Sequence, residues 1–320
     1  MNYRRLGRAG VKVSSLCLGA GVRGALDPQR FRRTIAHAID LGCNFIDCAN
    51  NYGGGQSEIL LGQAIKGKRD QLVITSKVFT RIGPGPNDQG LSRTHILRAV
   101  EQSLAKLQTD WIDIYYLHNV DPETPLEETL RTIEDLVRQG KVRYVGASNH
   151  TADQAIELLW TADRLGLEPI SCMQSHYNLL HRWELEPELL EVCRRYGLGL
   201  VTYSPLAVGL LSGRFRRSFP APADTFWNQE RVQAALTEPT DQVIQALVDL
   251  ANQRGATPAQ LAVAWLLDHP EITAPIVGAD RPEYFDDVVG ALAITLTAEE
   301  RAVLDAVSQW STPMRGNAPG

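Results

Sequence analysis

Four polar residues stand at or just beyond the ends of apolar stretches, and their side chains suit proton transfer to a carbonyl oxygen. Asp47 and Tyr52 lie within residues 45–53, Lys77 ends an apolar run at 72–77, and His118 ends another at 112–118. A tyrosine hydroxyl ordinarily has a pKa of about 10, and a nearby lysine ammonium lowers it. A carboxylate would keep that lysine charged, and a histidine can donate a hydrogen bond to the carbonyl oxygen. The residue types therefore favour acid–base chemistry at a carbonyl group.

Each of the four residues also has an ordinary structural interpretation. Tyr52 precedes a glycine, as turn residues often do, and a histidine that ends a strand is commonly a satisfied core residue. Lys77 would be a solvated strand end, and Asp47 a helix cap or turn residue. Taken singly, these interpretations are the better ones. Taken together, the four indicate a site, because a parallel β/α barrel gathers the ends of successive strands at one rim.

The elements that must position these residues follow from the alternation of apolar runs with amphipathic stretches, which predicts a parallel α/β fold. A chain of 320 residues fits one (β/α)8 TIM barrel, which typically needs about 250, with room for long rim loops. We expect a single domain over residues 1–320, a hairpin at Arg4–Val13 that caps the barrel bottom, and rim loops at 81–90 and from Tyr203 to about Pro239. The eight expected strands are Ser15–Leu18, Asn44–Asp47, Leu72–Lys77, Trp111–His118, Val142–Ala147, Ile170–Gln174, Leu198–Tyr203 and Thr273–Val277.

Helix starts are predicted by a recurring Thr-x-x-Glu/Gln pattern, in which the two side chains cap the first turn. In the first occurrence, Thr124 is expected to be the N-cap and Pro125 the first helical residue. The four occurrences are Thr124–Glu127, Thr151–Gln154, Thr257–Gln260 and Thr297–Glu300.

Composition narrows the functional class. The net charge of −5 is mild and no basic block is present, which argues against nucleic acid as a partner. No apolar stretch is long enough to span a membrane, and the chain begins without an apolar signal region, so we expect a cytoplasmic protein. The five cysteines lack metal-ligand spacing and mostly lie in apolar runs, which indicates buried, reduced thiols.

The strings around Asp47, Tyr52, Lys77 and His118 resemble the aldo-keto reductases, and the resemblance covers nearly the whole chain. It implies a barrel enzyme that transfers hydride between a nicotinamide cofactor and a small aldehyde, ketone or sugar-like substrate. It further implies that Asp47 orients Lys77, Lys77 tunes Tyr52, Tyr52 is the general acid, and His118 positions the substrate oxygen.

The same resemblance implies a cofactor site across the barrel mouth. Ser148, Asn149 and Gln174 match residues that hold the nicotinamide carboxamide, Tyr203 suits stacking on its ring, and Arg214 suits phosphate. No Gly-x-Gly-x-x-Gly follows the first strand, which disfavours a Rossmann site. The full set of expected cofactor residues is Gly19, Ala20, Gly21, Asp47, Ser148, Asn149, Gln174, Tyr203, Ser204, Pro205, Leu206, Gly209, Arg214, Gly278, Asp280, Tyr284 and Asp287.

Three features depart from the family pattern, at Cys48, at Asn119, and at Asp280 together with Tyr284 and Val288. Cys48 replaces a threonine or serine, and Asn119 replaces an aromatic residue or arginine beside the histidine. Asp280 stands where a serine or cation commonly contacts the 2′-phosphate of NADP(H). Its carboxylate would repel that phosphate but accept hydrogen bonds from a free ribose diol, unless it only caps the helix that starts near Pro282. The resemblance implies a preference for NADP(H), and NAD(H) or dual use is left open.

Two other functional classes compete with a reductase. The segment Gly90–Ile96 and the tail Ser311–Gly320 resemble the family's potassium-channel β-subunits, so a regulatory subunit of a membrane protein complex is the alternative. His118 favours the enzyme, since those channel partners tend to lack it. A metal-dependent hydrolase lacks support because no His/Asp/Glu cluster has ligand spacing. The substrate and the oligomeric state are left open, and Phe79, Trp183, Phe226 and Trp227 are equally consistent with pocket lining and with packing.

Overall fold

The computed structural model describes residues 1–21, 27–217, 219–220, 222, 229–278 and 281–309. Ten strands are present in these residues, two in a hairpin and eight in a closed barrel. The hairpin strands are β1 (Tyr3–Arg5) and β2 (Lys12–Ser14). The barrel strands are β3 (Cys17–Gly19), β4 (Phe45–Asp47), β5 (Val73–Val78), β6 (Ile112–Leu117), β7 (Val142–Ser148), β8 (Cys172–His176), β9 (Gly199–Tyr203) and β10 (Ile272–Gly278).

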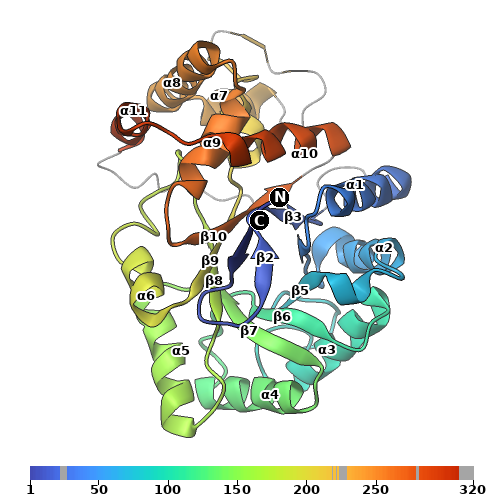
Figure 1. Cartoon of the computed structure of the whole chain (residues 1–320). Coiled ribbons are helices and arrows are strands. Elements are labelled where there is room, and N and C mark those ends of the chain that lie inside the picture. Colours follow the sequence, from blue (N-terminus) through green and yellow to red (C-terminus); the bar gives the residue numbers. More distant parts are fainter. Residues whose placement is uncertain (22–26, 218, 221, 223–228, 279–280, 310–320) are drawn as a thin grey trace.

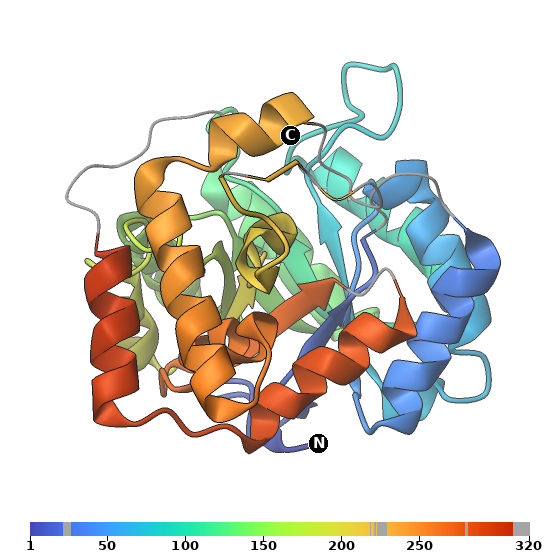
Figure 2. The ribbon, with the colours of Figure 1, turned by 90° about the horizontal axis from the view of Figure 1, so that it is seen from above.

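Helices surround the barrel strands in the views of Figures 1 and 2. The α-helices are α1 (Pro28–Asp40), α2 (Gln56–Ala64), α3 (Arg93–Leu107), α4 (Leu126–Arg138), α5 (Ala152–Leu165), α6 (Leu189–Tyr196), α7 (Gln229–Ala235), α8 (Glu238–Arg254), α9 (Pro258–Leu267), α10 (Pro282–Val289) and α11 (Ala298–Ser308). Four short 3-10 helices join them: η1 (Tyr52–Gly55), η2 (Arg69–Gln71), η3 (Ala207–Ser212) and η4 (Gly290–Ala293).

The barrel strands follow one another around the ring in chain order, and β10 closes the ring by pairing in parallel with β3. All barrel pairs are parallel, so the carboxyl ends of the strands face the same rim. Because helices cover the outer face of the ring, every residue of β5 is buried, which is why such strands appear in the sequence as apolar runs. The prediction of a (β/α)8 barrel with an N-terminal hairpin is confirmed.

The Thr-x-x-Glu/Gln pattern located three of the four helix starts that it predicted, at Thr151, Thr257 and Thr297. Thr257 and Thr297 each accept a hydrogen bond from the backbone N–H three residues on, and Gln260 and Glu300 reciprocate, as the capping pattern predicts. The prediction at Thr124 is wrong, because α4 begins at Leu126 with Pro125 in the cap position and no side-chain cap. The hydroxyl of Thr124 instead donates to Asp121, 2.8 Å away.

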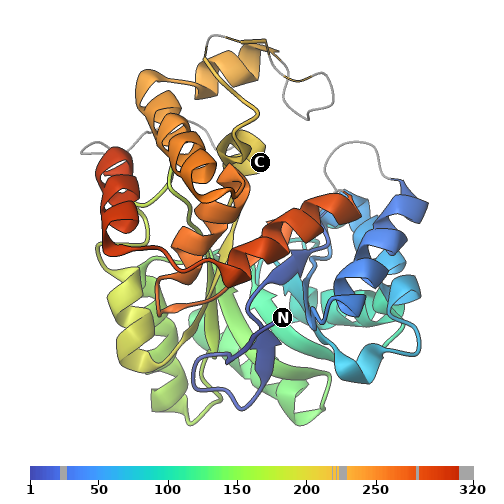
Figure 3. The same cartoon turned by 45° about the horizontal axis from the view of Figure 1, so that its top comes forward.

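The second long rim segment, after Tyr203, is partly helical, since it contains η3 and α7. Beyond it, α9 is buried along most of its length because it packs between β10 on one side and α8 and α10 on the other. Figure 3 shows α8 and α11 lying side by side outside α9. The side of the barrel near its closure is therefore two helices thick.

The hairpin packs against the amino-terminal side of the barrel through a contact that only glycine permits. Gly7 has a φ of +55°, and a Cβ there would lie 2.2 Å from the backbone N of Gly199, the first residue of β9. The neighbouring N–H of Arg8 donates to the carbonyl of Gly197 at 2.7 Å. Leu6 and Val13, both fully buried, then extend the barrel's inner core.

We predict that Gly7→Ala lowers the free energy of unfolding by about 1–3 kcal/mol, since the added methyl group forces two backbone segments apart. Gly10→Ala in the same hairpin is the control, because nothing lies within 4 Å of its Cβ position and its effect should stay within about 0.5 kcal/mol. Denaturation in urea measures both, and equal midpoints for the two variants would contradict the contact.

Candidate active site

The structure places the four residues that could act on a carbonyl at one rim. Asp47 is the last residue of β4, Lys77 lies near the end of β5, and His118 follows β6 directly. Tyr52 begins η1, the short helix that leads from β4 toward α2. Three neighbouring parallel strands thus deliver three of the side chains, and the loop after β4 delivers the fourth.

Lys77 and Asp47 form a buried ion pair at the centre of this group. The Lys77 Nζ donates to both carboxylate oxygens of Asp47, at 2.8 and 2.7 Å, and to the carbonyl oxygen of Cys48 at 2.9 Å. It also donates to the hydroxyl of Tyr52 at 3.1 Å. The Lys77 side chain has no exposed surface, so the ammonium depends on these oxygens in place of water.

The ionisable groups around Lys77 shift one another's pKa. Burial alone would lower the pKa of Lys77, but the Asp47 carboxylate and the contact with Tyr52 outweigh it, and the pKa is raised. Lys77 therefore stays an ammonium. Burial raises the pKa of Tyr52, and Lys77 opposes that rise without cancelling it. The expectation that Lys77 brings the phenol's pKa below its usual value is therefore corrected, because desolvation of the phenolate is the larger effect.

His118 lies beside Tyr52 with a neutral ring. The two ring centroids are 6.2 Å apart with the planes at 75°, an edge-on arrangement. Burial, followed by the nearby charge of Lys77, lowers the pKa of His118 to about 3. Its Nδ1 is buried and has no hydrogen-bond partner among the residues that the structure describes. A neutral imidazole at this position can donate one hydrogen bond through whichever nitrogen carries the proton.

Two of the three expected carboxamide-binding residues are hydrogen-bonded to the same group. Gln174 Nε2 donates to Asp47 Oδ1 at 2.8 Å, so this amide already binds the carboxylate. Asn149 donates to the carbonyl oxygen of His118 at 2.9 Å and accepts from the hydroxyl of Tyr203 at 2.9 Å. The hydroxyl of Ser148 is buried without a partner in the described part of the chain. Ser148 Oγ is thus a buried polar atom for which a ligand amide is a suitable partner.

The loop after β9, which carries the expected cofactor residues Ser204, Pro205, Leu206 and Gly209, has an unusual backbone. Ser204, Ala207 and Val208 have φ values of 56°, 46° and 56°, a region that side chains other than glycine seldom adopt. A β-branched residue such as Val208 is especially disfavoured there. Held strain of this kind is concentrated at functional sites, so it supports a binding role for the loop.

The remaining expected cofactor residues fall into three groups. Gly19 pairs with Asp47 on one side and Gly278 on the other, and the N–H of Ala20 donates to the Asp47 carbonyl, so these small residues adjoin the ion pair. A Cβ on Gly21 would meet the Tyr52 ring at 3.5 Å.

The second group is Arg214, whose guanidinium lies 3.5 Å from the hydroxyl of Tyr284. The third departs from the expectation: the carboxylate of Asp287 accepts from Thr257 at 2.9 Å, within the helical layer. Asp280 lies outside the described residues, as do Phe226 and Trp227. The α10 helix itself begins at Pro282 with Arg281 in the cap position and no side-chain cap.

Sequence reasoning missed three residues of this region. Thr75 donates to Asp47 at 2.8 Å, and its spacing of two from Lys77 on one strand would have indicated a shared face. His176 stacks on Tyr203, with centroids 5.0 Å apart and planes at 4°, and Asn178 donates to the carbonyl of Ser204 at 2.9 Å. These two contacts depend on the alignment of β8 with β9, which no local pattern reveals.

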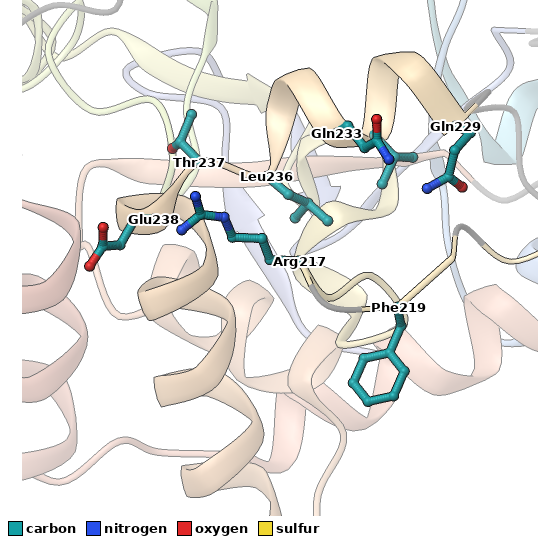
Figure 4. A pocket seen from close by; sticks show the side chains of 8 residues that line it. Arg217, Phe219, Gln229, Gln233, Leu236, Thr237 and Glu238 are labelled. Carbon is teal, nitrogen blue, oxygen red and sulfur yellow. The ribbon is translucent and has the colours of Figure 1, made fainter.

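A pocket of about 510 Å³ lies beside α7 and the start of α8. Figure 4 shows Arg217, Phe219 and Leu236 among the side chains that line it. None of the described residues that line it belongs to the group around Lys77 or to the expected cofactor residues.

Within the described ranges, no three His, Cys, Asp or Glu side chains are placed to hold a metal ion together. No helix in the same ranges is both long enough and apolar enough to cross a membrane. All five cysteines are buried free thiols, as expected.

Comparison with known proteins gives a consistent result. The model for the Aldo/keto reductase family matches residues 15–309. A protein of Arabidopsis thaliana named "Probable voltage-gated potassium channel subunit beta" is 35% identical over 97% of this chain and 96% of its own length. A protein of the same name from Oryza sativa subsp. japonica is 36% identical over 98% of each chain. The "L-glyceraldehyde 3-phosphate reductase" of Escherichia coli (strain K12) is 34% identical over 95% of this chain and 92% of its own length.

We predict that the His118 imidazole stays neutral down to at least about pH 5, well below the ordinary pKa of about 6.5. Its carbon-bound proton signal in NMR spectra, identified by its loss in His118→Gln, measures this. The unfolded chain takes up this proton near pH 6.5, whereas the folded chain does so only near pH 3. His118 therefore contributes stability above pH 6.5 that is lost as the pH falls toward 3. Between these pH values, the free energy of unfolding should change less steeply with pH in His118→Gln than in the wild type. A titration midpoint near pH 6.5 would contradict the buried, neutral ring.

Proposed function

The chain belongs to the aldo/keto reductase family, whose members are NAD(P)-dependent oxidoreductases, and we propose that it reduces the carbonyl group of a small aldehyde, ketone or sugar-like substrate. The observation that carries the proposal is the buried Lys77 ammonium, which contacts Asp47 and the Tyr52 hydroxyl at once. A fully buried lysine held 3.1 Å from a phenol is difficult to explain as a structural device alone.

In the proposed reaction, Tyr52 donates its proton to the substrate's carbonyl oxygen as that oxygen gains negative charge. Lys77 favours this transfer because its positive charge stabilises the phenolate that remains. Asp47, fixed by Thr75 and Gln174, keeps the ammonium in place. His118, neutral over the working pH range, donates a hydrogen bond that orients the carbonyl.

The residues around this group suit a nicotinamide cofactor. Ser148 offers a buried, unpartnered hydroxyl within the described part of the chain, and the open space at the Cβ position of Gly278 leaves room for close approach of a flat ring. Ser148, Asn149 and Gln174 would hold the carboxamide, and Tyr203 would stack on the ring. When bound, the nicotinamide supplies the hydride that the protein's own side chains cannot.

We favour NADP(H) over NAD(H). Arg214 and Arg281 both lie near Tyr284, the guanidinium carbon of Arg281 being 6.0 Å from the centre of the tyrosine ring. Two cations beside an aromatic face suit an adenosine 2′-phosphate. Asp280 opposes this preference, so its effect needs direct measurement.

A second function, as a regulatory subunit of a membrane protein complex, is favoured by one observation. Two relatives that match this chain over nearly its full length carry the name of a potassium channel subunit. The presence of His118 favours the reductase. We also propose a cytoplasmic location, because the five free thiols are suited to a reducing compartment.

We predict that Tyr52→Phe lowers kcat for aldehyde reduction by at least about 10²-fold, since a positioned general acid typically contributes about 10²- to 10⁴-fold. Cofactor affinity should change little, because only one hydroxyl is lost. Tyr196→Phe is the matched control, since that ring is exposed on α6. Steady-state oxidation of NADPH with a panel of small aldehydes measures kcat, and near wild-type turnover in Tyr52→Phe would refute the assignment.

We further predict that NADPH binds more tightly than NADH and that Asp280→Ser widens the difference. Removing a carboxylate about 4 Å from a phosphate is worth about 1 kcal/mol in water, or roughly fivefold in affinity. Titration of protein fluorescence with each cofactor gives both dissociation constants. Glu283→Ser removes the same charge from the exposed first turn of α10 and serves as the control. An unchanged ratio in Asp280→Ser would show that Asp280 does not set the cofactor preference.

A further inference from the structure

A second buried carboxylate lies behind the group around Lys77. Glu58 belongs to the first turn of α2 and has no exposed surface. Its Oε1 accepts a hydrogen bond from the hydroxyl of Ser76 at 2.7 Å. Neither residue belongs to the set proposed for catalysis or cofactor binding. Burial of a carboxylate is unfavourable unless it is hydrogen-bonded and paired with a cation, so the partners of Glu58 need an explanation.

Glu58 and Asp47 lie on opposite sides of the barrel wall. Successive residues of a strand point to opposite faces, so Lys77 points into the barrel and Ser76, the residue before it, points outward to the helices. Lys77 binds Asp47 on the inside, and Ser76 binds Glu58 on the outside. Cys48 lies between the two carboxylates: burial raises the pKa of its thiol, and the charge of Glu58 raises it further. The same residue's carbonyl accepts from Lys77.

A lysine of α3 lies next to Glu58 on the outer side of the barrel wall. Lys106, near the end of α3, places its Nζ 3.5 Å from Glu58 Oε2. Gly55, directly before α2, has a φ of +89°, and a Cβ there would lie 2.7 Å from Lys106 Nζ. The glycine thus leaves the space that the ammonium occupies. Glu58 thereby connects the start of α2 to β5 and to α3.

This connection controls the backbone that carries Tyr52. Tyr52 is followed by Gly53, Gly54 and Gly55, all with left-handed φ values of 57°, 63° and 89°. Glycine is the least restricted residue, so this run has little rigidity of its own. The N–H of Gln56, the first residue of α2, donates to the carbonyls of Tyr52 and Gly53, so the placement of α2 acts on the backbone of Tyr52. The helix after the run, α2, is held to the strand of Lys77 through the Glu58–Ser76 hydrogen bond.

We propose that Glu58 is a positioning residue, which fixes the distance between Tyr52 and Lys77 by fastening α2 to β5 through Ser76. The proposal rests on the reductase function proposed above. When the Glu58–Ser76 bond is lost, the start of α2 moves outward, the 3.1 Å contact lengthens, and Lys77 no longer offsets the rise in the pKa of Tyr52.

Two serine variants test the proposal with a matched control. Ser76→Ala removes the hydroxyl that donates to Glu58. Ser57→Ala removes a hydroxyl that is equally buried in the same turn as Glu58 but has no partner among the described residues. Glu58→Gln is the conservative variant, since its amide oxygen still accepts from Ser76. Lys106, which is 27% exposed at its side chain, can then turn toward solvent.

We expect kcat to fall by about 10- to 10²-fold in Ser76→Ala, because a misplacement of about 1 Å can cost 10²-fold. The alkaline limb of its pH–kcat profile should move to higher pH, and a crystal structure should show the Tyr52–Lys77 contact beyond about 3.5 Å. Ser57→Ala should match the wild type in all three measurements, and Glu58→Gln should retain most of the wild-type kcat.

Equal losses in the two serine variants, or an unchanged 3.1 Å contact in Ser76→Ala, would overturn the positioning role. The crystallographic distance separates this result from a failure of the proposed function. If the wild type reduces no aldehyde but the contact still lengthens in Ser76→Ala alone, the positioning role stands and the reductase assignment falls.

Discussion

A lysine ammonium without access to water is the constraint on which the rest of this rim depends. Removing Lys77 from solvent is unfavourable by several kcal/mol, and the barrel offsets this with oxygens from Asp47, Cys48 and Tyr52. Asp47, at the end of β4, in turn needs Thr75 from the neighbouring β5 and Gln174 from β8 across the ring. The charge therefore specifies not one contact but the relative placement of several strands. A neutral side chain at position 77 would leave the Asp47 carboxylate buried without its counter-ion.

The pairing of Lys77 with Asp47 also explains how a buried site can serve proton transfer. Burial raises the pKa of Tyr52 and lowers that of His118 to about 3, so both groups are held in their neutral, proton-donating forms. Lys77 is held in the opposite, charged state by Asp47. Three groups within one small region thus have their protonation states fixed by desolvation and by a single ion pair, without any group needing to titrate near neutrality.

The barrel could be predicted from the sequence because local patterns mark its strands and several of its helix starts. Each strand is buried on both faces and so forms an apolar run, and Thr257 and Thr297 cap helices through residues three positions away. The capping pattern failed at Thr124, where a competing acceptor, Asp121, takes the hydroxyl. The candidate residues at strand ends were found for the same reason. The bond from Ser76 to Glu58 and the stacking of His176 on Tyr203 were not, because strand alignment and helix docking decide them.

The closure of the barrel has a consequence for how the chain is made. Cys17 in β3 pairs with Ile276 in β10, so the first and last strands of the ring are joined only when nearly the whole chain exists. At ordinary translation rates, β3 emerges more than about ten seconds before its partner. During that interval, β3 of the nascent chain lacks its partner β10 along one edge. The hairpin lacks its contact with Gly199 until β9 has been made. Synthesis of this protein therefore passes through a stage at which an unpaired strand edge is exposed to aggregation.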